Sequence, residues 1–342
     1  MRVLVTGGAG YIGSHTVLSL LAAGHDVLIL DSFATSSPRV IKRLKALSGR
    51  DIHVIERDVR DHKAMRAVMV SWVPDAVIHF AGLKSVAESV ADPALYYDVN
   101  VGGTVSLLRA MDEIGCSKVV FSSSATVYGM PDYLPYDEAH PTNPVNPYGR
   151  TKLVAEQLFG HWIAAREGRA VTALRYFNPA GAHPSGEIGE DPSGTPNNLM
   201  PYVAQVAVGR RPYLTIFGDD YETRDGTGER DYIHVMDLAE AHLAALQHLQ
   251  AGAGMQVYNI GTGQGATVHE IVAAFEAASG VHVLTQVAER RAGDLPRFFA
   301  DARRAEDAIG WKALRGLPQM CRDSWAWQSR NPDGYESQSD AA

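Results

Sequence analysis

A glycine-rich turn lies directly after the first short apolar run and directly before an apolar stretch of helical character. Its sequence is TGGAGYIG, at residues 6–13. A tight turn from strand to helix needs a residue without Cβ, a second glycine lets the main chain approach a pyrophosphate, and a third lets the helix pack closely on the sheet. The start of the helix also offers free N–H groups to phosphates. The turn therefore predicts an α/β unit that binds a dinucleotide, with a purely structural glycine turn as the alternative.

The identity of the dinucleotide is indicated by Asp31. This residue ends the second apolar run, at about the 20-residue distance from the glycines that the motif requires. Its carboxylate can accept hydrogen bonds from the adenosine ribose diol but would repel a 2′-phosphate, and no arginine follows it immediately. The sequence therefore favours NAD over NADP, and Arg39 is the residue that could reverse this preference.

Short apolar or β-branched runs recur through the first half of the chain. They are separated by segments long enough for crossover helices, a pattern typical of a parallel sheet covered on both faces. We therefore predict an α/β fold with a doubly wound parallel Rossmann sheet. The runs are residues 3–6, 27–30, 53–55, 76–80, 119–122 and 171–174.

Two helices have ends that can be read from the sequence. One is expected to begin near Pro93 and to stop at Gly115. The other has Asn146 as a candidate N-cap, Pro147 in its first turn and Gly168 just past its end. Long amphipathic helices usually cover a core, and contact with a second subunit is the alternative.

The regular alternation of strands and helices breaks after Asn178. The segment 179–201 is rich in Gly, Pro, Ser and Asn, which indicates a long functional loop and a change of domain. We expect a Rossmann domain at 1–178 that also receives 230–262, a smaller C-terminal substrate-binding α/β lobe formed mainly by 179–342, and a frayed polar tail at 331–342.

Composition excludes several classes of protein. The formal net charge of −8 and the isoelectric point near 5.9 argue against binding to nucleic acid or to an anionic membrane surface. Only two cysteines occur, so a disulfide framework is not expected. No apolar run approaches the roughly 18 residues that span a bilayer, and the first apolar run is too short for a signal peptide. We therefore expect a cytoplasmic protein.

Tyr148 and Lys152 form the first candidate catalytic pair. Because they are four residues apart just inside the second helix, both project from one face. A free tyrosine, with a pKa of about 10, is a poor base at neutral pH, but a nearby ammonium group favours the phenolate. Such a pair could take the proton of an alcohol while hydride leaves the same carbon. The alternative for a lone Tyr-x-x-x-Lys is a solvated helix face.

Three serines, Ser122, Ser123 and Ser124, occur at the end of the fifth apolar run. They lie at the carboxyl end of a strand, where open α/β sheets bind their ligands. A hydroxyl at this position could bind the reacting oxygen and relay its proton. In the simpler interpretation the serines only terminate the strand and bind main-chain groups.

Taken together, these residues resemble those of the extended short-chain dehydrogenases/reductases, and the wider strings are similar to the UDP-galactose (UDP-glucose) 4-epimerases of that family. The similarity extends from residue 1 to about residue 335. The strings that carry it are FAGLK (80–84), SSSATVYG (122–129), RYFNP (175–179), PNNL (196–199), 228–237 and 291–296.

The resemblance implies a specific reaction. Tyr148 would remove the proton of the sugar 4-hydroxyl with help from Ser124, and C4 would pass hydride to tightly held NAD. The 4-keto sugar would turn over and take the hydride back on its other face, which interconverts UDP-galactose and UDP-glucose without net redox change. Related 4,6-dehydratases carry Thr-Asp-Glu where this chain has Ser124-Ala125-Thr126, so dehydration is disfavoured.

The resemblance also implies the residues that bind each ligand. Arg230 and Arg291 would hold the diphosphate, because arginine presents a planar fork of donors to phosphate, and Asp294 would bind the ribose. The implied cofactor residues are Gly7, Gly10, Tyr11, Ile12, Gly13, Asp31, Asp58, Val59, Phe80, Ala81, Gly82, Lys84, Tyr148, Lys152 and Phe177. The implied substrate residues are Lys84, Ser124, Thr126, Tyr148, Asn178, Asn198, Leu199, Thr215, Phe217, Arg230, Arg291, Asp294 and Phe298.

Two positions depart from the family pattern. Many members have Asn-Asn where this chain has Val99-Asn100, which predicts looser binding of NAD. Phe298 occupies the position at which members that accept N-acetylated sugars carry a small residue. Its ring would fill the volume of an acetamido group, so we expect little activity on UDP-N-acetylglucosamine.

Alternatives to this 4-epimerase remain within the same fold. One is an epimerase of UDP-uronates or UDP-pentoses. Another is a non-catalytic NAD-sensing protein, which would not need the Tyr148–Lys152 pair. No metal site is expected, because no His-x-x-x-His spacing occurs and His79, His183 and His234 read as structural. By analogy with the family, the helices that follow Pro93 and Pro147 are expected to form a homodimer interface.

Overall fold

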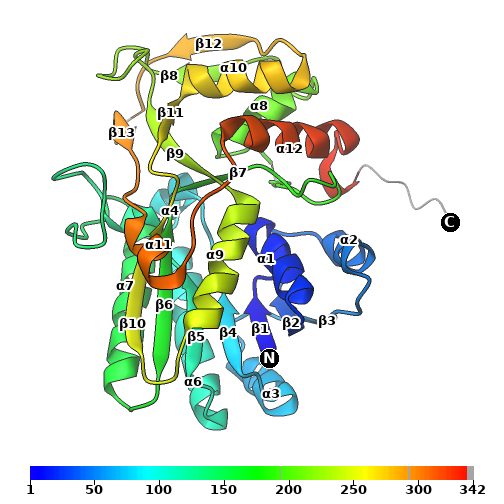
Figure 1. The fold of residues 1–342 in the computed structure, drawn as a ribbon, viewed down its shortest axis with the longest axis vertical. Coiled ribbons are helices and arrows are strands. Elements are labelled where there is room, and N and C mark those ends of the chain that lie inside the picture. The colour runs from blue at the N-terminus through cyan, green and yellow to red at the C-terminus, as the bar shows by residue number, and fades with distance from the viewer. Residues whose placement is uncertain (193, 292, 337–342) are drawn as a thin grey trace.

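The computed structural model describes residues 1–192, 194–291 and 293–336. Within them a parallel sheet of seven strands is covered by helices on both faces, and a smaller group of strands and helices lies at one end of it (Figure 1). The strand order is β10-β6-β5-β4-β1-β2-β3. The chain thus winds outward in both directions from β1, which confirms the predicted doubly wound α/β fold with a smaller C-terminal lobe.

The six predicted strands all form close to their expected bounds. The seventh strand, β10, joins the sheet beside β6 from a much later part of the chain. The strands are β1 (Arg2–Thr6), β2 (Asp26–Asp31), β3 (His53–Glu56), β4 (Ala76–His79), β5 (Lys118–Ser122), β6 (Ala170–Tyr176) and β10 (Gly254–Ile260).

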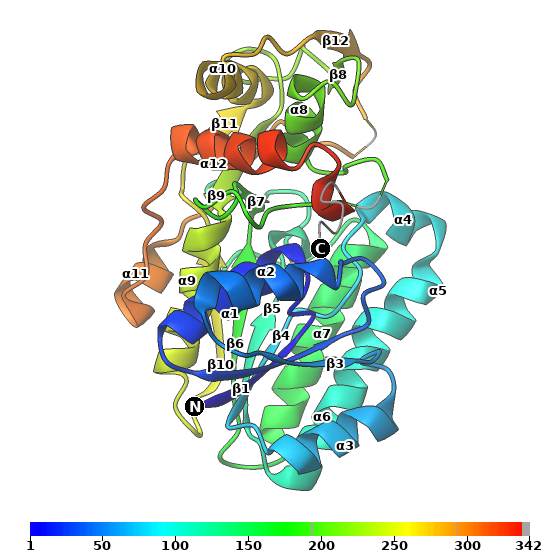
Figure 2. The same cartoon turned by 90° about the vertical axis from the view of Figure 1, so that its right-hand side faces the viewer.

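Helices cover both faces of this sheet, as the two views together show (Figure 2). Apolar residues of α1, α2 and α9 pack on one face, and those of α3, α6 and α7 pack on the other. The helical segments are α1 (Tyr11–Ala22), α2 (Arg39–Ser48), α3 (His62–Trp72), α4 (Val86–Ala91), α5 (Pro93–Tyr96), the π-helical η1 (Tyr97–Gly102), α6 (Gly103–Ile114), the 3₁₀ turn η2 (Ala125–Val127), α7 (Pro147–Ala164) and α9 (Val235–His248).

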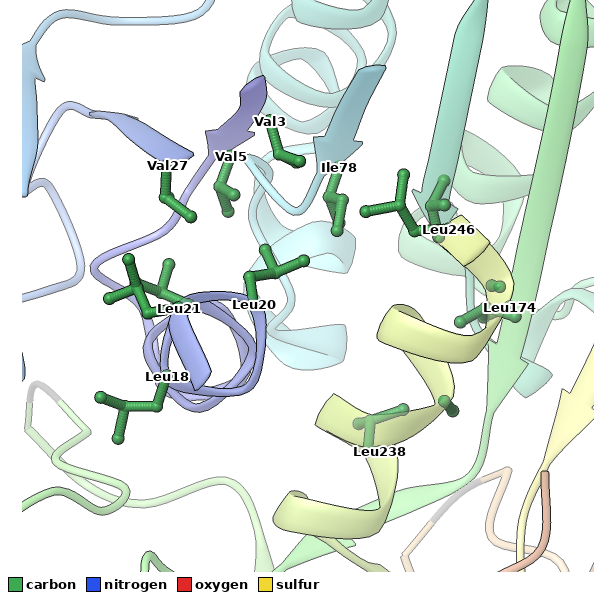
Figure 3. Packing of buried hydrophobic residues seen from close by; sticks show 14 of the residues in the cluster. Val3, Val5, Leu18, Leu20, Leu21, Val27, Ile78, Leu174, Leu238 and Leu246 are labelled. Atoms are coloured by element: carbon green, nitrogen blue, oxygen red, sulfur yellow. The ribbon is translucent and has the colours of Figure 1, made fainter. Parts of the chain in front are cut away.

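The core follows the two-residue period of the strands. Val3 and Val5 point toward the face covered by α1 and α9, where they belong to the same apolar cluster as Leu20 and Leu246 (Figure 3). Leu4, between them in sequence, belongs to the core on the opposite face. Because both faces are buried, the strands read as continuous apolar runs rather than as alternating ones.

The helix expected between Pro93 and Gly115 is interrupted. The short α5 passes into the π-helical η1 and then into α6, which ends at Gly115 as predicted, with φ at +72°. Within η1 the buried Asn100 binds the main-chain N–H and C=O of Leu83 at 2.8 and 3.1 Å. The wider π turn thus places an amide against the loop after β4, and such turns often occur at functional sites.

The second predicted helix begins as expected. The Asn146 side chain accepts a 2.8 Å hydrogen bond from the Gly149 N–H, and Pro147 occupies the first turn of α7. The helix ends at Ala164, before Gly168, which lies in the following turn. The start of α7 is therefore fixed at the position that carries Tyr148.

The smaller lobe is built around β9, which pairs with β7, β11 and β13. A separate two-stranded sheet joins β8 and β12. The division of the chain at residues 178 and 179 remains a prediction. The elements of this part are β7 (Asn178–Ala180), α8 (Leu199–Ala207), β8 (Leu214–Phe217), β9 (Glu229–His234), β11 (Gly265–Thr267), α10 (Val268–Ser279), β12 (Thr285–Ala288), β13 (Arg297–Phe298), α11 (Arg303–Ile309), α12 (Leu317–Arg330) and the 3₁₀ turn η3 (Gly334–Glu336).

The frayed tail expected at 331–342 is wrong for residues 331–336. Asn331 and Tyr335 are buried, and the guanidinium of Arg43 lies 4.9 Å from the centroid of the Tyr335 ring. Arg43 also donates a 2.8 Å hydrogen bond to the Asn331 side chain. These polar residues are ordered because α2 supplies their partners, and residues 337–342 lie outside the described chain.

Candidate active site

The glycine turn after β1 is closed by its own main chain and by the end of β4. Gly7 has φ at +72°, and a Cβ on it would lie 2.7 Å from the Ala81 nitrogen. A Cβ on Gly13 would collide with the Gly7 carbonyl oxygen. The turn can therefore carry no side chain at these two positions, and the main chain at the start of α1 stays accessible to a phosphate. These features fit a dinucleotide.

Asp31 is placed at this turn, as the sequence predicts. Its Oδ2 accepts a 2.9 Å hydrogen bond from the Ala9 N–H, and its Oδ1 accepts bonds from the Phe33 N–H and the Ser36 hydroxyl at 2.9 and 3.0 Å. The carboxylate therefore ties the end of β2 to the glycine turn. Oδ1 already accepts two hydrogen bonds, whereas Oδ2 keeps a further lone pair for a ribose hydroxyl. Arg39 donates instead to the Tyr335 carbonyl at 3.1 Å.

The structure gives positions for most of the other predicted cofactor residues. The Tyr11 hydroxyl donates a 2.6 Å bond to the Gly181 carbonyl, which links α1 to the loop after β7. Asp58 is paired with Arg60, whose guanidinium also reaches Asp98. The other members of this group are the partly buried Ile12, Phe80, Ala81 and Gly82 and the buried Val59.

The structure brings the three predicted catalytic residues together. Ser124 lies two residues after the end of β5, and its side chain interacts with that of Tyr148 at the start of α7. The Lys152 ammonium lies 6.0 Å from the centroid of the Tyr148 ring. Thr126 donates a 2.9 Å hydrogen bond to the Ser124 hydroxyl oxygen. The arrangement can pass a proton between a bound hydroxyl group, Ser124 and Tyr148.

The electrostatics differ from the expectation for Tyr148. Burial raises the pKa of its phenol, and the hydrogen bond with Ser124 acts in the opposite direction. Burial also lowers the pKa of Lys152 to about 8, against the effect of Glu156. Desolvation is therefore the main cause of both pKa shifts. The Lys152 ammonium donates to the main-chain oxygen of Ser122, at 2.8 Å.

The predicted substrate residues of the smaller lobe form a charged cluster. The Asp294 carboxylate lies between two guanidinium groups, 3.7 Å from Arg230 and 3.0 Å from Arg291. Arg230 is further fixed by a 2.7 Å bond to the Leu295 carbonyl, and Arg291 lies over the Phe217 ring, 4.6 Å from its centroid. The aromatic ring and the two guanidinium groups suit a nucleobase and a diphosphate.

Two more predicted residues, Lys84 and Asn198, share one partner that the sequence analysis missed. Both donate 2.9 Å hydrogen bonds to Oε1 of Glu190, which is nearly buried. Glu190 therefore links the loop after β4 to the start of α8. The remaining predicted residues of this region lie at element ends or in β8, and they are Asn178, Leu199 and Thr215.

Phe298 lies in an aromatic cluster rather than alone. Its ring centroid is 5.0 Å from that of Phe177 and 4.9 Å from that of Tyr136. The Tyr136 hydroxyl donates to the Gly129 carbonyl at 2.8 Å, which fixes that ring. Tyr136 was also missed, because nothing in its local sequence indicates that it packs against β13.

The histidines expected to be structural are hydrogen-bonded to other side chains of the chain. His79 is buried between Thr6 and Thr104, with ring nitrogens 2.7 and 3.2 Å from their hydroxyls. His234 lies 3.0 Å from the Asp323 carboxylate. In the described part of the chain, no group of three or more His, Cys, Asp or Glu side chains is arranged to hold a metal ion.

Comparison with known proteins places this geometry in a family. The model of the NAD dependent epimerase/dehydratase family matches residues 3–261, which is more than half of the chain. The chain belongs to this family. The resemblance to extended short-chain dehydrogenases/reductases is thereby confirmed, and the glycine turn and the Ser124–Tyr148 contact both lie within the matched region.

Similar members of the family resemble the chain over nearly its whole length. UDP-glucose 4-epimerase 4 of Oryza sativa subsp. japonica is 56% identical over 98% of this chain and 92% of its own. The structure of UDP-glucose-4-epimerase from Stenotrophomonas maltophila with bound NAD and formylated UDP-arabinopyranose matches with a TM-score of 0.95, 50% identity and coverage of 97% and 99%. The structure of UDP-glucose 4-epimerase from Bifidobacterium longum in complex with NAD+ and UDP matches with a TM-score of 0.94 and 47% identity. The match covers 98% of this chain and 100% of that one.

Proposed function

We propose that this chain is an NAD-dependent UDP-glucose 4-epimerase, an isomerase that interconverts UDP-galactose and UDP-glucose. The observation that carries the proposal is that Ser124, Tyr148 and the buried Lys152 ammonium lie together, with the ammonium 6.0 Å from the Tyr148 ring centroid. Similarity over the full chain to proteins named UDP-glucose 4-epimerase supports it.

The cofactor would be held by the glycine turn and by residues at the ends of β2 and β4. Gly7, Gly10 and Gly13 carry no side chain that would cover the first turn of α1, whose main-chain N–H groups could bind the pyrophosphate, and Asp31 Oδ2 has a lone pair left for a ribose. When bound, NAD would supply a reversible hydride acceptor. The predicted cofactor residues are thus assigned to NAD as part of this proposal.

The protein's own part in the reaction is proton transfer. Tyr148 would take the proton from the sugar 4-hydroxyl, and Ser124, beside Tyr148, would bind the same oxygen and guide the proton between them. The positive charge of Lys152, fixed by Ser122, would stabilise the phenolate that forms. After the sugar has turned over, Tyr148 would return the proton to the same oxygen.

The substrate would be held mainly by the smaller lobe. Arg230 and Arg291 would bind the diphosphate, and the Asp294 carboxylate would then be free for the ribose hydroxyls. Phe217 and Thr215 would border the uridine, since the Phe217 ring is partly exposed next to Arg291. Asn178, Asn198 and Leu199 would line the pocket for the sugar.

A dehydration is not supported by the side chains at the end of β5. Elimination across the sugar C5–C6 bond needs an acid and a base next to Ser124. Ala125 has no ionisable group, and the Thr126 hydroxyl is bound to Ser124. The site therefore holds the groups for reversible oxidation at C4 and lacks those for elimination.

A proton NMR time course tests the proposal. Purified protein is mixed with UDP-galactose without added nucleotide, and the anomeric signal of UDP-glucose is followed. We expect UDP-glucose to appear and to reach the same ratio from either sugar. Conversion only after NAD is added would support loose cofactor binding caused by Val99. No conversion with saturating NAD would exclude this sugar pair and leave other UDP-sugars or an NAD sensor.

A second substrate class deserves the same assay. The structure from Stenotrophomonas maltophila, 50% identical, contains formylated UDP-arabinopyranose. A UDP-pentose lacks the C6 group of a hexose and would bind the same diphosphate residues of this chain. We therefore propose UDP-pentoses and UDP-uronates as alternative substrates, to be compared with UDP-galactose by kcat/KM.

We also propose a homodimer and a cytoplasmic location. The segments α4 and η1 pack against α7 and carry exposed apolar side chains, among them Val90 and Tyr97. Burial of this surface by a second copy would give a four-helix interface, and light scattering would detect the doubled mass.

Among the described helices, none has the length and apolarity needed to cross a membrane. Both cysteines, Cys116 and Cys321, are free and buried.

A further inference from the structure

Three side chains on α7 clamp the end of β5. Tyr148, Lys152 and Glu156 follow one another at four-residue intervals, so they share one face of the helix. They meet three consecutive serines, and each contacts a different one. The contacts are a 2.8 Å bond from Lys152 Nζ to the Ser122 carbonyl, a 2.5 Å bond from the Ser123 hydroxyl to Glu156 Oε1, and the interaction between the Ser124 and Tyr148 side chains.

Glu156 is itself held rigidly. Its side chain is only 6% exposed and forms an ion pair with Arg175 of β6, which is 8% exposed. Arg175 donates two hydrogen bonds to the carboxylate, of 3.0 Å from Nε and 2.6 Å from Nη2. The guanidinium also lies over the Tyr128 ring, 4.9 Å from its centroid. A bidentate pair of this kind fixes the carboxylate in both position and orientation.

We propose that Glu156 is a positioning residue for the epimerase reaction. It holds Ser123, and with it the adjacent Ser124, against Tyr148, and its negative charge supports the Lys152 ammonium. This inference rests on the proposed function, because it gives Ser124, Tyr148 and Lys152 the roles assigned there. Glu156 touches neither the sugar nor the cofactor in that assignment, so it acts through its neighbours.

Among the titratable groups near Lys152, Glu156 is the one that can stabilise the ammonium by its charge. The neighbouring titratable groups are Tyr148 and Glu156 on α7, His79 on β4 and Tyr176 on β6, which faces Tyr148. Burial lowers the pKa of His79 to about 3, and burial raises the pKa values of both tyrosines, so these groups are uncharged near neutral pH. Burial also lowers the pKa of Lys152 to about 8, and Glu156 opposes that effect.

The first test measures Lys152 directly, without any turnover. The full-length protein is labelled with ¹³C- and ¹⁵N-lysine, and the Lys152 signal, assigned with Lys152→Met, is titrated by NMR. In Glu156→Gln the titration midpoint should fall by about half a pH unit or more, because a nearby negative charge is lost. In Arg175→Met it should rise, because Glu156 is no longer neutralised. The matched control Glu167→Gln, at an exposed residue just after α7, should leave it unchanged.

The second test measures positioning. Ser123→Ala keeps the charge of Glu156 but removes its hydrogen bond to the serine segment, so kcat should fall about fivefold with KM and the Lys152 midpoint unchanged. In Glu156→Gln the alkaline limb of the kcat profile should move to lower pH together with the Lys152 midpoint. If Glu156→Gln does not fold, Ser123→Ala still tests the positioning role, and Arg175→Met still tests the effect of the Glu156 charge on Lys152.

The outcomes separate this proposal from the function on which it rests. An inactive wild-type protein contradicts the epimerase assignment, and the NMR titration still tests the charge effect. An active wild-type protein whose Lys152 midpoint is the same in Glu156→Gln and Glu167→Gln overturns the electrostatic role. A Ser123→Ala protein with wild-type kcat overturns the positioning role.

Discussion

The ammonium group of Lys152 donates a 2.8 Å hydrogen bond to the main-chain oxygen of Ser122, the last residue of β5. This bond fixes a buried positive charge beside Tyr148. Lys152→Met keeps the apolar stem and removes the charge, so the phenolate loses its stabilisation. We expect kcat to fall by about 10²- to 10⁴-fold with little change in KM, measured by the UDP-galactose assay.

The exposed Lys63 of α3 provides the control for this substitution. Lys63→Met makes the same chemical change at an exposed position on another helix and should keep wild-type kinetics. A Lys152→Met protein that folds normally and retains more than about a tenth of wild-type kcat would contradict a role for its charge in proton transfer.

Three buried histidines predict a loss of stability in mild acid. Burial lowers the pKa of His15 and of His79 to about 3, and that of His242 to about 4. In the unfolded chain each would titrate near its ordinary value of about 6.5. Below that pH the unfolded state binds protons that the folded state does not. The stabilisation is therefore complete above about pH 6.5 and is lost as the pH falls toward about 4, by up to about 1.4 kcal/mol per pH unit for each histidine.

Denaturant unfolding at several pH values measures this effect. Carboxylates titrate in the same range, so the comparison uses His242→Gln, whose amide can still donate to the Leu238 carbonyl that His242 contacts at 2.8 Å. Its free energy of unfolding should depend less steeply on pH, by about one proton between pH 6.5 and 4.5. His269→Gln, at an exposed residue, should keep the wild-type slope. Equal slopes in all three proteins would contradict a neutral His242 in the folded state.

Local features of the fold could be predicted because their causes are local in sequence. The glycine turn, Asp31 and the Asn146 cap each depend on residues within a few positions of one another or on a fixed motif spacing. The strands were visible because both faces of the sheet are buried, which makes each strand a continuous apolar run. The position of Tyr148 and Lys152 beside the serines then follows from the order of the strands.

The features that sequence analysis missed depend on distant partners. Glu190 bonds to Lys84 across 106 residues, and Tyr335 is buried by Arg43 from the other end of the chain. Tyr136 lies next to Phe298 because its N–H donates a 3.0 Å bond to the Phe299 carbonyl. No local pattern marks such contacts. Glu156 was also missed, although its signal is local. Its four-residue spacing from Lys152 puts it on the same face of α7 as Lys152 and Tyr148.

The π-helical segment gives a prediction about cofactor retention. Val99 lies in η1 beside Asn100, whose side chain is already used by Leu83 and Thr151. Val99→Asn would add a polar group without disturbing those bonds. We expect NAD to be retained about fivefold more tightly, the effect of one additional hydrogen bond, as measured by nucleotide released after repeated ultrafiltration. Val101→Asn, in the same segment, is the control, and equal retention by both variants would exclude Val99 as the cause of loose binding.

Phe298 gives the prediction about sugar specificity. Its ring is held against Phe177 and Tyr136, so it cannot move aside without breaking two aromatic contacts. Phe298→Ser would remove the ring and leave a space next to the predicted sugar pocket. We expect the variant to convert UDP-N-acetylglucosamine, with a change of about 10- to 200-fold in the ratio of kcat/KM values for the acetylated and plain sugars. Coupled assays with each sugar measure that ratio.

The neighbouring Phe299 makes a sharp control for this steric argument. Phe299 lies just after β13, and its ring makes no contact with Phe177 or Tyr136 among the ring pairs of the described residues. Phe299→Ser should therefore leave the sugar preference unchanged even if it lowers stability. If the unaltered protein already converts UDP-N-acetylglucosamine as fast as UDP-glucose, the ring does not limit the pocket. If both serine variants change the preference equally, general loosening of β13, rather than the volume at Phe298, sets specificity.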